Sequence, residues 1–192
     1  SHSAVAVALS ALLRDRVPEI PPGVMGVDLG TSYSCVAIFW NGTAEAIVDN
    51  GSALVPSFVG LGEHGLVVGE EARQLSSTFP DSVVFDAKRL LGLSLSGAGA
   101  LQDLRLYPFE IVSINETAHI NLKRGDVSRV FSPEEIGSVV VSELKRRAEK
   151  HLGRPVDRAV MAVPVDFTAA QRNATRRAGE LAGLNVLHLI TE

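Results

Sequence analysis

The chain has 192 residues, of which 46% are hydrophobic and 21% charged, and its net charge is -4 at pH 7. This length suits one large domain or two small ones, and the mild acidic balance argues against a surface for nucleic acid or an anionic membrane, which would need clustered Lys and Arg. The single cysteine, Cys35, excludes an internal disulfide framework and a cysteine-based zinc site, and its apolar neighbours predict a buried thiol.

We interpret residues 1–23 as a leader and linker. Residues 4–13, AVAVALSALL, are apolar but only about half as long as a membrane-spanning helix. The prolines of residues 14–23, RDRVPEIPPG, cannot continue a helix. A truncated signal peptide or membrane anchor and a disordered leader both stay open as interpretations. Any membrane contact is expected through this segment.

The next part of the chain has the pattern of short strands. Two apolar stretches are joined by a turn that contains glycine, and Asn41-Gly42 then predicts a tight hairpin, because a type I′ turn needs positive φ at both central residues. Two further apolar stretches follow, and we predict one antiparallel meander over residues 24–69. The four stretches are 24–30, 34–40, 53–61 and 65–69.

The middle of the chain mixes helical and strand patterns. A short helix is predicted after Gly69 and a second one over residues 86–91. Residues 93–103 have a loop-like composition. Residues 107–131 predict a small group of strands with polar turns.

The clearest helix begins after Ser132. Ser132 and Glu135 have the spacing of a capping box, apolar residues then recur every four positions, and Gly153 ends the helix. The basic run at residues 145–147 predicts a solvated helix face rather than a binding patch.

Strand and helix alternate over the rest of the chain. A strand at residues 156–164 is followed by a helix that Thr168 caps and Gly183 ends, and then by a strand at residues 185–190. This order predicts a right-handed crossover and parallel pairing. The predicted fold class is therefore α/β, with flanking helices on a mixed sheet. Because the chain stops directly after an apolar strand, we expect it to be part of something larger.

The first turn, after Asp28, is a candidate phosphate-binding loop. The amides around Gly30 can cradle a phosphate, and the Thr31 and Ser32 hydroxyls add donors. Asp28 at the end of the first strand can hold a hydrated divalent cation that bridges phosphate oxygens. A surface turn with an incidental aspartate would have the same residue pattern, so both interpretations stay open on these residues alone.

Three separated motifs strengthen the first interpretation. They are GVDLGTSYSCVAIF, VFDAKRLLG and VMAVPVDFTAAQRNATRRAGELAGLNVLHLITE. In this order and spacing they resemble the ATPase domain of the seventy-kilodalton heat-shock chaperones, from about Val24 to Glu192. The resemblance implies the actin- and hexokinase-like fold, whose two ribonuclease-H-like lobes close on a nucleotide. The chain corresponds to the first lobe, with subdomain I-A at about 24–55 and 130–192 and subdomain I-B at about 56–129.

The resemblance also implies roles for individual residues. Asp28 matches the family acid beside the magnesium and potassium ions, where it acts through water, and Lys88 matches the catalytic lysine. Glu192 matches the glutamate near the metal-bound water. The first phosphate loop corresponds to Gly30, Thr31, Ser32 and Tyr33. The implied cofactors are ATP or ADP with Mg²⁺, and K⁺ as a second ion.

Pro164 and Arg172 match a pair that couples nucleotide state to the substrate-binding half of the chaperones. As residues alone, they are equally a strand terminator and an ordinary helix arginine. Asp166 and Phe167 replace the usual Tyr-Phe of this loop, which departs from the family pattern.

On this basis the sequence allows two functions and disfavours a third. The first is an ATP-binding and ATP-hydrolysing lobe, inactive by itself, to which J-domain co-chaperones and nucleotide-exchange factors would dock. The second is a non-enzymatic interaction module of the same family, because an isolated lobe exposes apolar surface. A sugar or acetate kinase on the same fold is disfavoured, because the motifs around Lys88 and Arg172 are of the chaperone type.

Within the family the chain most resembles the microsomal stress-seventy ATPase-core type, which lacks a peptide-binding domain. Four of the six asparagines lie in N-x-[ST] sequons, where about one would be expected at ordinary Ser and Thr frequencies. We therefore expect an endoplasmic reticulum protein, with a cytoplasmic location as the alternative. The sequons are at Asn41, Asn50, Asn115 and Asn173.

Overall fold

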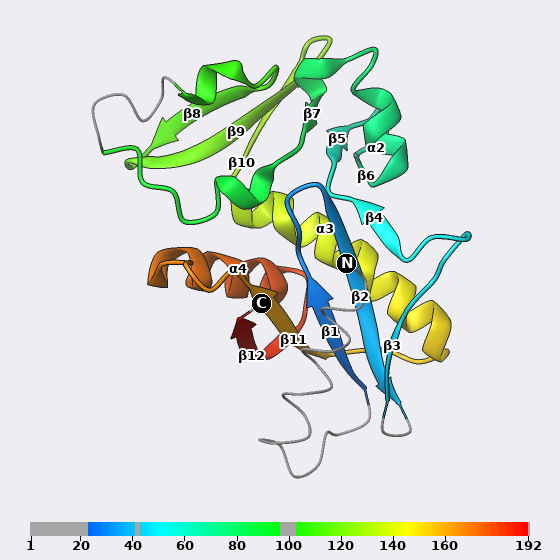
Figure 1. The fold of residues 1–192 in the computed structure, drawn as a ribbon. Coiled ribbons are helices and arrows are strands. Elements are labelled where there is room, and N and C mark those ends of the chain that lie inside the picture. Colours follow the sequence, from blue (N-terminus) through cyan, green and yellow to red (C-terminus); the bar gives the residue numbers. More distant parts are fainter. Residues whose placement is uncertain (1–22, 41–42, 97–102, 192) are drawn as a thin grey trace.

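The computed structural model describes residues 23–40, 43–96 and 103–191 (Figure 1). Within them, six strands form a large mixed sheet in the order β12-β11-β1-β2-β3, with β4 paired to β2. Its strand β1 runs antiparallel to β2 and parallel to β11, and β11 runs parallel to β12, so the predicted parallel continuation is confirmed. The strands are β1 (Val24–Asp28), β2 (Tyr33–Trp40), β3 (Thr43–Ala46), β4 (Leu54–Pro56), β11 (Arg158–Val163) and β12 (Asn185–Thr191).

Two smaller antiparallel sheets are formed by the part of the sequence that lies between β4 and β11. One has the order β6-β5-β7 and the other β10-β9-β8. The strands of the first are β5 (Val59–Leu61), β6 (Leu66–Val68) and β7 (Val83–Val84), and those of the second are β8 (Glu110–Ile114), β9 (Thr117–Arg124) and β10 (Val127–Phe131). The strands predicted for residues 107–131 are therefore confirmed. The assignment of subdomains stays a prediction.

The single meander predicted over residues 24–69 is wrong. It holds as far as β4, whose last paired residue is Pro56, opposite Tyr33. The Ser57 amide still donates to the Ser32 carbonyl at 2.9 Å, and the chain then leaves the large sheet, because β5 pairs with β6 and β7 in a separate one. Strands β2 and β3 pair from Trp40 opposite Thr43, and the Asn41-Gly42 turn between them lies outside the described residues, as does the leader before Gly23.

Three α-helices and three 3₁₀ turns are described. The helices are α2 (Glu70–Leu75), α3 (Pro133–Leu152) and α4 (Ala169–Leu181), and the turns are η1 (Pro80–Ser82), η2 (Ala87–Arg89) and η3 (Asp103–Leu106). The short helix after Gly69 is confirmed. The helix predicted over residues 86–91 is only the turn η2, because Asp86 before it has a left-handed φ of 56° and does not extend it. Helix α4 ends at Leu181, two residues before Gly183.

The ends of α3 follow from local chemistry. The Ser132 hydroxyl accepts a hydrogen bond from the Glu135 amide at 3.1 Å, and the Glu135 carboxylate accepts one from the Ser132 amide at 2.7 Å. Gly153 closes the helix in the left-handed conformation. Both the capping box and the glycine were predicted.

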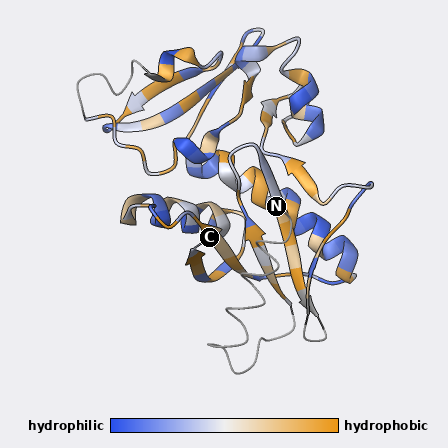
Figure 2. Cartoon of the chain, in the orientation of Figure 1, coloured by the Kyte–Doolittle hydropathy of each residue, from blue (hydrophilic) through white to orange (hydrophobic). Residues whose placement is uncertain are grey.

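Helices α3 and α4 pack on each other and on the large sheet, where α3 contacts β1 and β2 and α4 contacts β11 and β12. The core between them is apolar, and Figure 2 shows hydrophobic residues gathered on β1 and β2 while α2 and α4 carry many hydrophilic ones. Its fully buried members include Met25, Val27, Val36, Leu144 and Met161. Cys35 is also buried, as predicted. Among the described residues, no helix is long and apolar enough to cross a membrane.

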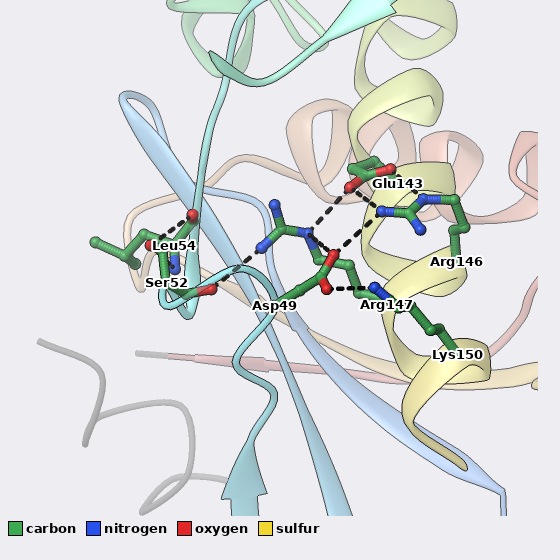
Figure 3. A network of polar contacts seen from close by, with 7 residues as sticks. All are labelled: Asp49, Ser52, Leu54, Glu143, Arg146, Arg147 and Lys150. Carbon is green, nitrogen blue, oxygen red and sulfur yellow. Dashed lines mark hydrogen bonds and ion pairs between the residues drawn. The ribbon is translucent and has the colours of Figure 1, made fainter. Parts of the chain in front are cut away.

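The basic run at residues 145–147 is not a simple solvated face. Arg146 and Arg147 both bind the Glu143 carboxylate, at 2.7 and 3.0 Å, and Asp49 accepts from Lys150 at 2.7 Å (Figure 3). The side chain of Arg147 is only 13% exposed. These ion pairs tie the turn at Asp49 to the outer face of α3.

The same contacts lower the pKa values of two carboxyl groups. The hydrogen bond from Lys150 holds the pKa of Asp49 below its ordinary value, with help from Arg146 and Arg147. Burial raises the pKa of Glu143, but the hydrogen bonds from Arg146 and Arg147 outweigh it, so that pKa is also lowered. Both groups are therefore carboxylates at neutral pH.

Candidate functional site

The turn between β1 and β2 is shaped by Gly30. A Cβ atom on Gly30 would lie 2.0 Å from the Tyr33 carbonyl oxygen, a distance that no side chain can accept. The chain therefore reverses direction tightly at this point. Because β1 ends at Asp28, its carboxylate lies at the entrance of the turn, where it is half-buried.

Two buried serines hold this turn in place. The Ser34 hydroxyl accepts a hydrogen bond from the Gly30 amide at 3.2 Å and lies 2.8 Å from the Ser57 hydroxyl. The Ser57 amide in turn donates to the Ser32 carbonyl at 2.9 Å. We expected the Gly30 amide among the phosphate donors, but it is bonded to Ser34, so the contribution of Gly30 is conformational.

Lys88 is positioned by the turn η2. The preceding Phe85 is fixed by aromatic contacts, with ring centroids 5.4 Å from Phe58 and 5.6 Å from Phe109. After the turn, Gly92 has a φ of 64°, and a Cβ there would lie 2.7 Å from the Ala170 carbonyl carbon. These two anchors bring Lys88 to the start of α4.

The third wall of the site is the loop between β11 and α4. Thr168 begins α4 with a capping box that Gln171 completes. The Arg172 guanidinium donates to the carbonyls of Phe167 at 3.1 Å and Val165 at 3.2 Å. The loop is therefore held in shape by the first turns of its own helix. It places the Phe167 ring 5.7 Å from the Lys88 ammonium nitrogen, within cation–π range.

These three segments enclose a cleft of about 580 Å³. Its lining residues are Asp28, Gly30, Thr31, Lys88, Arg89, Pro164, Phe167 and Gln171. The structure thus brings together five residues that the sequence singled out, from segments as far apart as Asp28 and Pro164. Lys88 is half-buried here, not an exposed surface lysine.

The other predicted site residues lie elsewhere. Ser32 and Tyr33 are exposed beside the cleft and do not line it, and Tyr33 is 50% exposed. Arg172 supports the cleft wall from behind. Glu192 lies outside the described residues.

Three lining residues were not assigned to the site from the sequence. Arg89 adjoins Lys88, and this adjacency was the only available signal for it. Phe167 was noted only as a departure from the family pattern. Gln171 is the third residue of a helix that Thr168 caps, and a helix start at the end of a strand is a recurrent ligand position in α/β folds.

The cleft suits a hydrated magnesium ion rather than a closed metal cage. Among the described residues, no group of three or more His, Cys, Asp or Glu is placed to hold a metal. Mg²⁺ keeps several water ligands and commonly binds one or two carboxylates together with substrate phosphates. Asp28 at the cleft fits that pattern, because it offers one carboxylate next to the space for a polyphosphate.

Fold and cleft together define an α/β protein in which a strand–turn–strand loop, a carboxylate and a lysine face one space. The family model described as Hsp70 protein matches residues 24–192, and the chain belongs to the Hsp70 family. The mixed sheet and its flanking helices agree with the actin-like lobe of the Hsp70 ATPase domain. Members of this family are chaperones that bind ATP or ADP with Mg²⁺.

Proposed function

We propose that the cleft binds the polyphosphate of Mg-ATP and forms one half of a chaperone-type ATPase site. The observation that carries this proposal is that Asp28, Thr31 and Lys88 line the same cleft. They come from two segments about sixty residues apart in the sequence, and a surface turn with an incidental aspartate gives no reason for Lys88 to lie beside it.

Each residue has a role that its chemistry supports. The Lys88 ammonium group stabilises negative charge that develops on the γ-phosphate and positions the attacking water. The Asp28 carboxylate would hold a hydrated Mg²⁺, and this ion would supply positive charge next to the phosphate oxygens. The Thr31 hydroxyl, which lines the cleft, and the exposed Ser32 hydroxyl beside it supply hydrogen bonds to phosphate.

Two further roles complete the proposal. From the family resemblance, we assign to Glu192 a role beside the metal-bound water, and to Pro164 with Arg172 the coupling of nucleotide state to the rest of a chaperone. The contacts of Arg172 with Phe167 and Val165 support such coupling, because they join the helix α4 to the cleft wall.

A second candidate function is a non-enzymatic interaction module that J-domain proteins or nucleotide-exchange factors contact. Two apolar side chains close to the cleft favour it, because Tyr33 is 50% exposed and Val165 is 73% exposed. Exposed apolar side chains of this size tend to recruit partners. This candidate predicts partner binding that the Lys88→Ala change leaves intact.

We also propose that the protein is of the microsomal ATPase-core type and works in the endoplasmic reticulum. The four sequons and the apolar stretch at residues 4–13 support this location. Fractionation of cells that express the complete protein would test it, and recovery in the cytosolic fraction would contradict it.

The decisive variant for the enzyme proposal is Lys88→Ala in the complete protein. We expect ATP turnover to fall about a hundredfold or more, because one preorganised charge on the reacting phosphate is removed, while equilibrium ATP binding changes little. Turnover is measured by phosphate release and binding by calorimetry. Lys123→Ala is the matched control, since Lys123 binds Glu110 on a smaller sheet. Unchanged turnover in Lys88→Ala would remove this lysine from the mechanism.

A further inference from the structure

The hairpin between β8 and β9 carries one of the four sequons, Asn115-Glu116-Thr117. Ile114 pairs with Thr117, so the loop consists of only two residues. Both have left-handed backbones, with φ of 50° at Asn115 and 60° at Glu116. Asparagine tolerates this region better than most side chains. The turn therefore accounts for the asparagine.

The side chains of this sequon are open to solvent. Asn115, Glu116 and Thr117 are all exposed. The Thr117 hydroxyl donates to the Ile114 carbonyl at 2.6 Å, and the Leu95 amide donates to the Glu116 carbonyl at 2.7 Å. These bonds fix the backbone of the turn, while the side-chain amide of Asn115 stays accessible to solvent. The tip between β8 and β9 lies at the outer end of their sheet (Figure 1). Asn115 is not among the residues that line the cleft.

The other described sequons are placed differently. Asn173 lies within α4, and the hydroxyl of its partner Thr175 is directed to the Gln171 carbonyl at 2.9 Å. Thr175 is only 2% exposed. Asn50 is exposed, but the adjacent Asp49 holds the ion pairs to α3. Asn41 lies outside the described residues. Asn115 is therefore the described sequon that combines an exposed amide, an exposed hydroxyl residue and distance from both the cleft and the ion-pair network.

We propose that Asn115 is an N-glycosylation site. The reaction forms a bond between the side-chain nitrogen Nδ2 of Asn115 and the sugar carbon C1 of a lipid-pyrophosphate-linked oligosaccharide. The bond from C1 to the pyrophosphate oxygen breaks, the lipid pyrophosphate leaves with the electron pair, and the amide nitrogen releases one proton to the solvent. A glycan here covers Ile114, which is 41% exposed, and keeps one edge of the small sheet in solvent. This proposal rests on the proposed location in the endoplasmic reticulum.

The test uses the complete protein in mammalian cells, in two forms. One form has its own N-terminus and the other has a strong secretory signal sequence added. The measurements are the gel mobility shift on peptide-N-glycosidase digestion and mass spectrometry of the peptide around residue 115. We expect Asn115→Asp to lose one glycan and Asn173→Gln to keep the wild-type pattern. Aspartate suits the left-handed turn as asparagine does, so loss of the glycan is separated from loss of the fold.

A second pair of variants leaves Asn115 in place. Thr117→Ala removes the sequon and is expected to abolish the glycan. Thr117→Ser keeps the sequon and is expected to keep the glycan. A wild-type glycan pattern in Asn115→Asp with the added signal sequence would overturn the proposal, as would an unmodified residue-115 peptide in that form. A glycan at Asn115 only with the added signal sequence would support the site and contradict the proposed location, so the two failures are distinguishable.

Discussion

At the scale of single residues, the position of the turn between β1 and β2 depends on two hydroxyl groups, those of Ser34 and Ser57, which do not line the cleft. Ser34 is completely buried and joins the Gly30 amide to the Ser57 hydroxyl. A buried donor or acceptor that loses its partner destabilises a protein by about 1–3 kcal/mol, more than the hydrogen bond contributes when formed. The hydrogen bonds of these two serines therefore stabilise the position of this turn.

Ser34→Ala is expected to lower the free energy of unfolding by about 1–3 kcal/mol, because it leaves both the Gly30 amide and the Ser57 hydroxyl without this partner. Urea denaturation followed by circular dichroism measures the change. Ser128→Ala is the control, since its hydroxyl donates to Asn121 at an exposed site and should shift stability by less than about 0.5 kcal/mol. Equal stability of the two variants would contradict the role given to Ser34.

The sequence predicted some site residues and missed others for a physical reason. Asp28 and Lys88 lie in recognisable motifs, and the structure brings both to one cleft. The Ser34–Ser57 contact joins residues 23 positions apart, and it forms only because β4 pairs with β2. No local pattern contains that information.

At the scale of elements, the helices were predictable where both partners of a contact are local. The Ser132 and Thr168 capping boxes each join residues three positions apart, so the start of each helix is encoded within one turn. The split of the predicted meander was not predictable in this way. The split depends on which of several apolar stretches pairs with β5. One of its two partners is β7, which follows in the sequence only after α2.

The ion pairs between the Asp49 turn and α3 predict a pH dependence. Asp49 and Glu143 have lowered pKa values in the fold, so they contribute stability above their unfolded-state values near ~4 and lose it as the pH falls through the folded-state values. We expect the melting temperature of the wild type to fall between pH 7 and pH 3. In Asp49→Asn the melting temperature should be lower than that of the wild type at pH 7 and should fall less between pH 7 and pH 3.

The control for this pH series is Glu110→Gln. Glu110 also has a lowered pKa, from hydrogen bonds with Lys123 and Asn121, but this ion pair is about half-exposed and is screened by water. Its melting curve in acid should follow the wild type more closely than that of Asp49→Asn does. Parallel curves for wild type and Asp49→Asn would show that the Asp49 ion pairs do not link pH to stability.

At the scale of the whole molecule, the cleft is bounded by three segments that all belong to one lobe. Under the proposed function, nucleotide is held between two lobes, and this cleft supplies one of the two sides. A cleft that contacts polyphosphate from one side offers fewer hydrogen bonds and leaves more of the ligand in water.

We therefore expect the 192-residue chain by itself to bind Mg-ATP weakly and to show no measurable turnover. Isothermal titration calorimetry with Mg-ATP tests the first statement, and circular dichroism verifies that the chain is folded. Micromolar affinity of the folded chain for Mg-ATP would contradict this expectation and show that one lobe suffices for binding.

Both ends of α4 are fastened to other parts of the molecule. At its start, Arg172 grips the carbonyls of the cleft wall, and at its finish the Lys145 ammonium of α3 donates to the carbonyls of Ala182 at 3.4 Å and Gly183 at 3.2 Å. The helix thus connects the cleft wall to α3 through hydrogen bonds at its two ends. A displacement of the wall at Phe167 can therefore reach α3 through the Lys145 contacts at the end of α4 and through the packing of the two helices.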